Sequence, residues 1–443
     1  MYEAVAVERL DKPVAVILAD GFEEDAVSAG SSRGMPGIRL VSENIPGECI
    51  VMDKVRAGLD ENVMDNIVVA LTKPLTQQEK SPKREVGELP RIVFKGDLQE
   101  VNHFLYMKGW TDGLPIIPPT EETVQEMLKG TDLPADHMVA ELIPRLGKAT
   151  VERIAINAVM AGALPTYMPL LIAGVQLLSD PDTRFGRVGV STGSWAPFWI
   201  VNGPVRNDVG VYGSVGALSP GHMANATIGR AMGLIIKDIG GVRQGIEDMG
   251  VQGNPCKYSM VTGENEEESP WEPLHVEQGF NKDDSTITLF FPNSYVDVLT
   301  YEANAKGVLN TVIYNIPPAR GGQTCILVNP TCASYLADEG WRKKDVERFV
   351  KEYARAPRNK HWWHGLGIRK EQLPFNDTDS MPLIIGDNQV RIVVSGKFSS
   401  YVGLAMGIFW PGFKFITKKV DLPANWGQLV EKYKHIAPTY ARY

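Results

Sequence analysis

The sequence is poor in cysteine. Its 443 residues contain 4 cysteines, which are widely spread and include no Cys-x-x-Cys pair. This distribution argues against a disulfide framework and against a structural zinc site. We therefore expect free thiols in a reducing compartment, the cytoplasm.

Positive charge is also scarce. The 45 Lys and Arg residues are outnumbered by 53 Asp and Glu residues, and the net charge of -8 argues against a nucleic-acid partner. The N-terminus carries Glu3 and Glu8 in place of a basic region, which is untypical of a secretory signal. Neither a P-loop nor a GxGxxG motif occurs, so no dinucleotide cofactor is predicted.

An uninterrupted membrane-spanning run is missing as well. The most apolar stretch, Ile154–Leu178, is long enough to cross a bilayer, but it contains Pro165 and Pro169. Because proline breaks a helix, this stretch predicts two buried helices and no membrane span.

The remaining composition is that of an ordinary globular protein, with 44% hydrophobic and 22% charged residues. The length predicts two or three domains, and the polar segment Lys73–Pro90 is the best boundary. We expect a domain over residues 1–75, a linker over 76–95 and a main region over 96–443, with a subdivision near 280–300.

Strands alternating with helices along the chain predict an α/β fold, with a small N-terminal α/β domain and a larger mixed α/β region. Thr120 is the expected N-cap of the helix that follows it. The segments expected to form strands or helices are 13–20, 23–31, 38–43, 60–71, 91–98, 97–108, 228–239, 285–291, 310–316, 324–328, 344–356, 390–396 and 401–410.

The segment Gly216–Arg230 combines a glycine-bearing loop with a helix start. Unpaired N–H groups at such a start favour an anion, so Gly221, Asn225 and Arg230 are candidate ligand-binding residues. Arg230 stands close to the positive helix end, and either an anionic ligand or a carboxylate of the protein would offset that conflict.

The segment Gly263–His275 holds five glutamates and a histidine. Glu264, Glu266 and His275 are candidate acid–base groups, because carboxylates and imidazole transfer protons when burial shifts their pKa. The alternative is a solvated acidic surface loop.

Metal binding is a further possibility. His222, His275 and Glu264 would form a two-histidine, one-carboxylate site for a divalent transition metal if they converged. The histidines of HWWH, residues 361–364, could also coordinate a metal, although the flanking tryptophans favour an aromatic packing cluster.

Three single residues complete the candidates. Cys256 precedes Lys257, whose ammonium would favour a reactive thiolate; the alternative is a small buried hydrophobe. Asp112 is either a turn residue or a site carboxylate. Trp195 lies in the stretch 191–199, whose composition is typical of a small-molecule pocket.

The run FEEDAVSAGSSRGMPGIRLVSENIP, with the helix VVALTKPL after it, resembles the UGSC-type (seleno)protein family over residues 14–75. The resemblance implies an α/β domain with a redox-active selenocysteine or cysteine near its start. This chain departs from that pattern, since its first cysteine is Cys49. The domain is therefore expected to serve docking or folding. The rest resembles the uncharacterised domain found beside or fused to such proteins.

Together these features favour an enzyme that acts on a small anionic molecule by carboxylate and histidine acid–base chemistry or metal-assisted chemistry, in the manner of a lyase or hydratase. A thiol-linked redox enzyme is one alternative. Another is a non-catalytic subunit of an oligomer with a partner that carries the active cysteine or selenocysteine.

Overall fold

The computed structural model describes residues 2–45, 47, 52–74, 76, 90–318, 322–357, 360, 379–407 and 412–436. Most of the predicted linker, Cys49 and the HWWH segment lie outside these residues.

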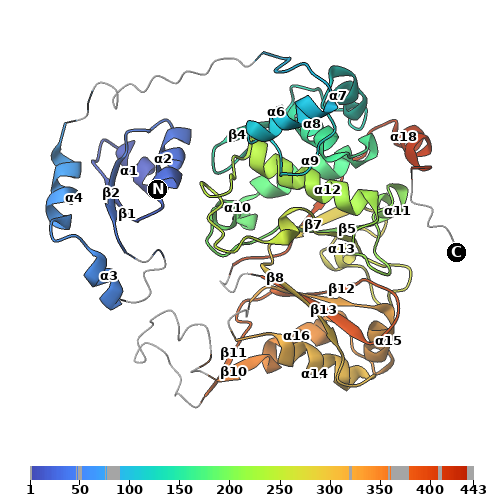
Figure 1. Cartoon of the computed structure of the whole chain (residues 1–443). Coiled ribbons are helices and arrows are strands. Elements are labelled where there is room, and N and C mark those ends of the chain that lie inside the picture. The colour runs from blue at the N-terminus through green and yellow to red at the C-terminus, as the bar shows by residue number, and fades with distance from the viewer. Residues whose placement is uncertain are drawn as a thin grey trace.

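The N-terminal part forms a small α/β unit around two parallel strands, as predicted (Figure 1). The strands pair from Ala15 with Arg39 to Ala19 with Glu43. Its elements are α1 (Tyr2–Glu8), β1 (Ala15–Ala19), α2 (Glu23–Ser32), β2 (Arg39–Glu43), α3 (Met52–Gly58) and α4 (Val63–Thr72).

The main region begins with a helical part and a four-stranded sheet of order β14-β7-β5-β6. Its elements are α6 (Leu98–Met107), α7 (Glu121–Leu128), β3 (Met138–Leu142), β4 (Gly147–Thr150), α8 (Val151–Ala161), η1 (Pro165–Tyr167), α9 (Met168–Ser179), η2 (Pro181–Thr183), α10 (Phe185–Val188), β5 (Phe198–Asn202), α11 (Pro204–Asp208), α12 (Met223–Leu234), η3 (Ile235–Ile239), η4 (Pro255–Lys257), β6 (Val261–Gly263), α13 (Leu274–Glu277) and β7 (Thr286–Phe290).

The second part of the main region contains a four-stranded sheet of order β12-β9-β13-β8. Its elements are β8 (Ser294–Leu299), α14 (Ala305–Asn315), β9 (Thr324–Val328), α15 (Pro330–Asp338), α16 (Lys343–Tyr353), β10 (Arg355–Pro357), β11 (Ser380–Pro382), β12 (Val390–Val394) and β13 (Tyr401–Met406). The chain then returns to the first sheet with β14 (Ile416–Lys419) and ends in α18 (Trp426–Tyr433).

The two sheets repeat one arrangement. In the first, β5 has parallel β6 on one side and antiparallel β7 on the other; in the second, β9 has parallel β12 and antiparallel β13. The fourth strands are exchanged in chain order: β8 follows β7 in the chain but pairs with β13, and β14 follows β13 in the chain but pairs with β7. This reciprocal exchange ties the two halves into one body.

The inner faces of the two sheets pack on each other, and helices cover the outer faces (Figure 1). Alternate side chains explain this layering, because successive residues of a strand point to opposite faces. Phe198 and Ile200 of β5 meet Cys325 and Leu327 of β9 in one shared core, whereas Trp199 packs with the helices of the first half.

The apolar stretch forms two buried helices, as predicted. Helix α8 ends at Gly162, which has a φ of 80°, and α9 begins after the short turn at Pro165. Within the described residues, no helix is long and apolar enough to cross a membrane.

Most expected elements are confirmed, with one correction. Residues 91–97 do not form a strand, although β7, β9, β12 and β13 lie where strands were expected. Asp97 and Thr120 cap α6 and α7, since the side chain of each accepts a hydrogen bond from the third backbone N–H of its helix.

Candidate functional site

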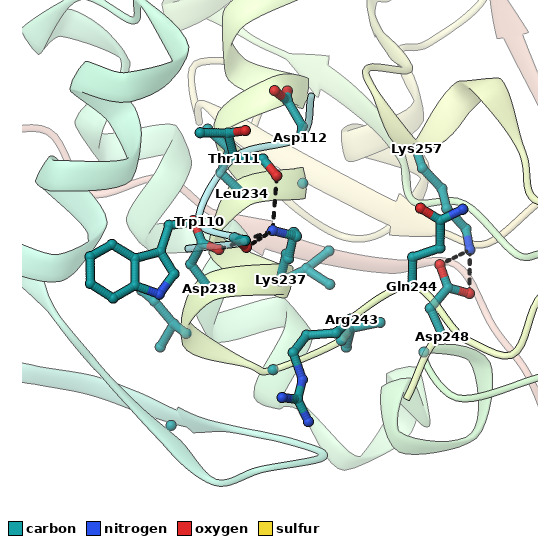
Figure 2. Close-up of a pocket in the computed structure, with 18 of the residues that line it drawn as sticks. Trp110, Thr111, Asp112, Leu234, Lys237, Asp238, Arg243, Gln244, Asp248 and Lys257 are labelled. Atoms are coloured by element: carbon teal, nitrogen blue, oxygen red, sulfur yellow. Dashed lines mark hydrogen bonds and ion pairs between the residues drawn. The ribbon is translucent and has the colours of Figure 1, made fainter. Parts of the chain in front are cut away.

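A cavity of about 940 Å³ opens beside the C-terminal end of α12 (Figure 2). Its wall combines the segment after α6, the β3–β4 hairpin, the start of α8, α10, the π-helical turn η3 and the loop that follows it. Trp110 and Trp195 contribute aromatic surface. A cavity of this size, whose wall combines apolar and polar side chains, is typical of a small-molecule site.

The charge of this wall opposes the charge of the whole protein. Seven cationic side chains line the cavity against three carboxylates, while the chain carries a net charge of -8. A concave cationic surface concentrates anions. The charged wall residues are Lys108, Arg145, Arg153, Arg230, Lys237, Arg243, Lys257, Asp112, Asp238 and Asp248.

The π-helical turn η3 places two of these charges next to each other. The bond from Gly240 N to Ile235 O, 3.1 Å, spans five residues. Such turns inside helices are frequent at functional sites. The apolar residues predicted to follow the helical spacing are buried here, so Lys237 and Asp238 face the cavity (Figure 2).

Asp238 is the unusual acid of the cavity. Its side chain is 16% exposed, and this burial raises its pKa to about 7. The Lys237 ammonium, 3.7 Å away, opposes the shift. Lys237 Nζ also donates to the carbonyls of Gly109 and Thr111, which hold it in place. A carboxyl that titrates near neutrality can both accept and donate a proton under ordinary conditions.

Several wall cations are neutralised by carboxylates. Arg230 Nε and Nη2 donate to Asp112 at 2.7 and 2.9 Å, and Lys257 Nζ lies 2.6 and 2.7 Å from the oxygens of Asp248. Arg243 binds Glu247 in the same bidentate way. These pairs shape the wall and leave little charge for a ligand.

Arg145 and Arg153 differ from these pairs. Among the described residues, neither guanidinium meets a carboxylate, and Arg153 Nη1 donates only to Lys148 O at 3.1 Å. Arg145 N donates to Gly240 O, and a Cβ on Gly241 would lie 2.4 Å from Arg145 Cδ. The Arg145 side chain therefore lies directly against the backbone that ends η3.

A second, smaller cavity of about 160 Å³ adjoins the first. It is lined by Arg153, Ile156, Asn157, Asp238 and Ile239, of which Arg153, Asp238 and Ile239 also line the larger cavity. Asp238 thus belongs to both.

Three of the residues proposed from the sequence line the larger cavity. Asp112 accepts from Leu114 N at 3.1 Å and binds Arg230, so it is both a turn residue and a wall carboxylate. Trp195 Nε1 donates to Ser191 Oγ. The position expected for Arg230 is wrong: α12 begins at Met223, so Arg230 lies beyond its first turns and does not oppose the helix dipole.

The other residues of the helix start have structural contacts. Asn225 accepts from Tyr212 N and donates to three carbonyls, so its amide is saturated and does not serve as the predicted ligand contact. The ring of His222 stacks on Tyr212 with centroids 3.7 Å apart. Gly221 has a φ of 140° in the loop before α12.

Glu264, Glu266 and His275 lie away from both cavities, where the two halves meet. Glu264 is completely buried and accepts from Asn202 Nδ2 at 2.6 Å, Leu274 N at 2.7 Å and Lys343 Nζ at 2.9 Å. We refer to Asn202, Glu264, Glu277 and Lys343 as the sheet-interface cluster.

The neighbouring groups follow the same pattern. Glu266 accepts from Gly203 N at 2.8 Å and from Asn202 Nδ2, and buried His275 has Nε2 3.2 Å from Lys282 O. Asn265 in the same segment donates from N to Val394 O and from Nδ2 to Gly396 O, so the segment connects the two halves. The surface-loop alternative holds for Glu267 and Glu268, whose side chains are 56% and 39% exposed, and for Glu272, which is also exposed.

The histidine–carboxylate metal set is not assembled. Among the described residues, no group of three His, Cys, Asp or Glu side chains is placed to hold a metal ion. Glu264, moreover, is already bound by three donors.

The expectation for Cys256 is also wrong. Burial raises the pKa of its thiol, and the Lys257 ammonium that should have lowered it is bound by Asp248. Cys256 is a half-buried residue that packs against the core between the sheets, which agrees better with the alternative interpretation.

No protein-family model and no curated protein matches the chain. The cavity residues thus stand on their geometry alone. Sequence reasoning missed Lys237, Asp238 and Asn157, although each left a signal: a charged pair at the end of an apolar helix, and an amide within the apolar stretch 154–178.

Proposed function

We propose that the protein is an enzyme that moves a proton to or from a small anionic molecule bound in the 940 Å³ cavity. The observation that carries this proposal is Asp238, a carboxyl with a pKa of about 7 in a wall where cations outnumber carboxylates. A lyase or hydratase-like reaction suits these groups, because both begin with a proton transfer beside an anionic group.

The roles divide among the wall residues. Asp238 accepts or donates the proton, the Lys237 ammonium 3.7 Å away stabilises negative charge, and the unpaired guanidiniums attract the anion. Trp110 and Trp195 would cover the apolar part of the molecule. This assigns the acid–base work to Asp238 in place of Glu264, Glu266 and His275.

Proton transfer can be tested before the substrate is known. A panel of small carboxylates and phosphate esters is incubated with the protein in D2O, and exchange of carbon-bound hydrogen or addition of water is followed by proton NMR. Asp238→Asn should slow the reaction of any active compound 100-fold or more, because a positioned acid or base contributes roughly 10²–10⁴-fold.

Asp297→Asn is the matched control. Asp297 also has a pKa raised by burial, but it lies on β8 and outside the cavity wall. Equal rates for Asp238→Asn and the wild type would contradict the proposal, and so would an equal loss in Asp297→Asn.

A second function, as a subunit that binds a partner, is supported by α4. This helix has no buried residue and exposes Met64, Val68 and Val69, which are 66%, 51% and 56% accessible. An apolar helix face of this kind is typical of an interface. Light scattering should give a mass above 48.8 kDa for the wild type and a lower mass for Val68→Asp.

A further inference from the structure

Asn157 in α8 presents a hydrogen-bond acceptor that no other described residue uses. Its side chain is 4% exposed, and Nδ2 donates to Arg153 O at 2.9 Å, which orients the amide. Oδ1 is buried and has no partner among the described residues. Burying such an acceptor without a donor is unfavourable, so a buried orphan acceptor requires an explanation.

The position of this acceptor points to a ligand. Asn157 lines the 160 Å³ cavity, and Asp238 and Arg153 line both that cavity and the larger one. A molecule bound in the larger cavity can therefore extend a polar group past Asp238 toward Asn157. That group must be a donor, because Oδ1 can only accept.

The same corner supplies positive charge. Arg153 lines both cavities, and Arg145, which lines the larger cavity, lies against the backbone at Gly241. A guanidinium binds a carboxylate with two parallel hydrogen bonds, a geometry that lysine cannot offer. The corner thus requires an anionic group and a hydrogen-bond donor within one small molecule.

We propose that the substrate is a small hydroxy acid. Its carboxylate binds Arg145 and Arg153, its hydroxyl donates to Asn157 Oδ1, and the hydroxyl-bearing carbon lies beside Asp238. This inference rests on the proposed function, since it requires an anion in the cavity, and it adds the class of that anion. Asn157 is then the residue that selects the hydroxyl.

The test uses pairs of acids that differ only in the hydroxyl. Lactate and propionate, malate and succinate, and mandelate and phenylacetate are titrated into the full chain by calorimetry. At least one hydroxy acid should bind tenfold or more tightly than its partner, because a buried acceptor left unpaired rejects the analogue without the hydroxyl. Arg145→Ala and Arg153→Ala should weaken both members of that pair equally.

Asn157→Leu and Asn157→Ala both remove the acceptor, and each should abolish the preference while leaving the binding of the deoxy acid unchanged. Asn315→Leu is the matched control, since Asn315 Nδ2 also donates to the carbonyl four residues earlier, Thr311 O, at 2.8 Å, in α14. Arg348→Ala, which removes a side chain that is 71% exposed on α16, controls for loss of an arginine.

Equal binding within every pair would overturn the hydroxy-acid assignment, since a water molecule would then satisfy Asn157, and would leave the proposed anion site standing. A preference that survives in Asn157→Leu and Asn157→Ala would also overturn it. Failure of all six acids to bind would overturn the anion site, and this inference with it.

Discussion

The cavity and the sheet-interface cluster both place a lysine beside a carboxylate, but they differ in how completely those groups are paired. In the cluster, Lys343 is 1% exposed and lies 2.9 Å from Glu264, which two further donors bind. In the cavity, Lys237 is 23% exposed and lies 3.7 Å from Asp238.

This difference in pairing distinguishes residues that stabilise the fold from residues that can act on a substrate. A carboxylate bound by three donors has little capacity left for a substrate, and here one of those donors, Lys343, joins the two halves of the main region. Asp238 keeps that capacity, and Asn157 beside it has an unused acceptor. Burial of charged residues alone therefore does not identify a site; incomplete pairing inside a cavity does.

The largest expected effect is on the free energy of unfolding, and it tests the comparison by replacing the two lysines. Lys343→Met should lower the free energy of unfolding by about 3–5 kcal/mol, because it leaves Glu264 buried and unpaired. Lys237→Met should lower it by about 1–2 kcal/mol, since its partners are two backbone carbonyls and the more distant Asp238, beside an open cavity. Urea unfolding of both variants measures the difference.

The two substitutions control each other, because each removes one ammonium from the main region and introduces the same side chain. Losses of similar size would show that Glu264 tolerates the missing partner, and the contrast between the fully paired Glu264 and the open site would fail.

Sequence reasoning succeeded where local chemistry decides the structure. The period of the apolar residues predicted the helix through Ile228 and Ile239, and Thr120 was recognised as a cap. It failed for the site, because pairing is decided by distant segments: Asp112 reaches Arg230 from 118 residues away, and Lys343 reaches Glu264 across 79. The spacing of apolar residues in the sequence predicts neither the π-helical turn nor the exchange of β8 and β14.

A smaller expected effect is the pH dependence of stability that Asp238 causes. Asp238 ionises near pH 7 in the folded protein and near pH 4 when unfolded, so the folded state holds the proton more tightly between these values. As pH rises from about 4 to about 7, the wild type should lose stability relative to Asp238→Asn, with no further change above that range.

Unfolding of both proteins across this range gives the difference directly. The subtraction matters because burial also raises the pKa of Glu277, in the sheet-interface cluster, to about 7. A difference that stays constant from pH 4 to pH 8 would mean that Asp238 ionises normally.

The smallest effect concerns the two helical asparagines, and it should change sign between them. Asn157→Leu removes a buried acceptor without a partner, so the free energy of unfolding should rise by about 1 kcal/mol despite the lost bond to Arg153 O. Asn315→Leu loses the same kind of bond but removes no unpaired acceptor. The free energy of unfolding of this variant should therefore fall by about 1 kcal/mol. Thermal unfolding in buffer without added acids measures both. Changes of opposite sign would mean that Asn157 lowers the stability of the wild-type protein, as is expected where a polar group is kept for a substrate. Two losses of equal size would mean that Asn157 is an ordinary helix residue.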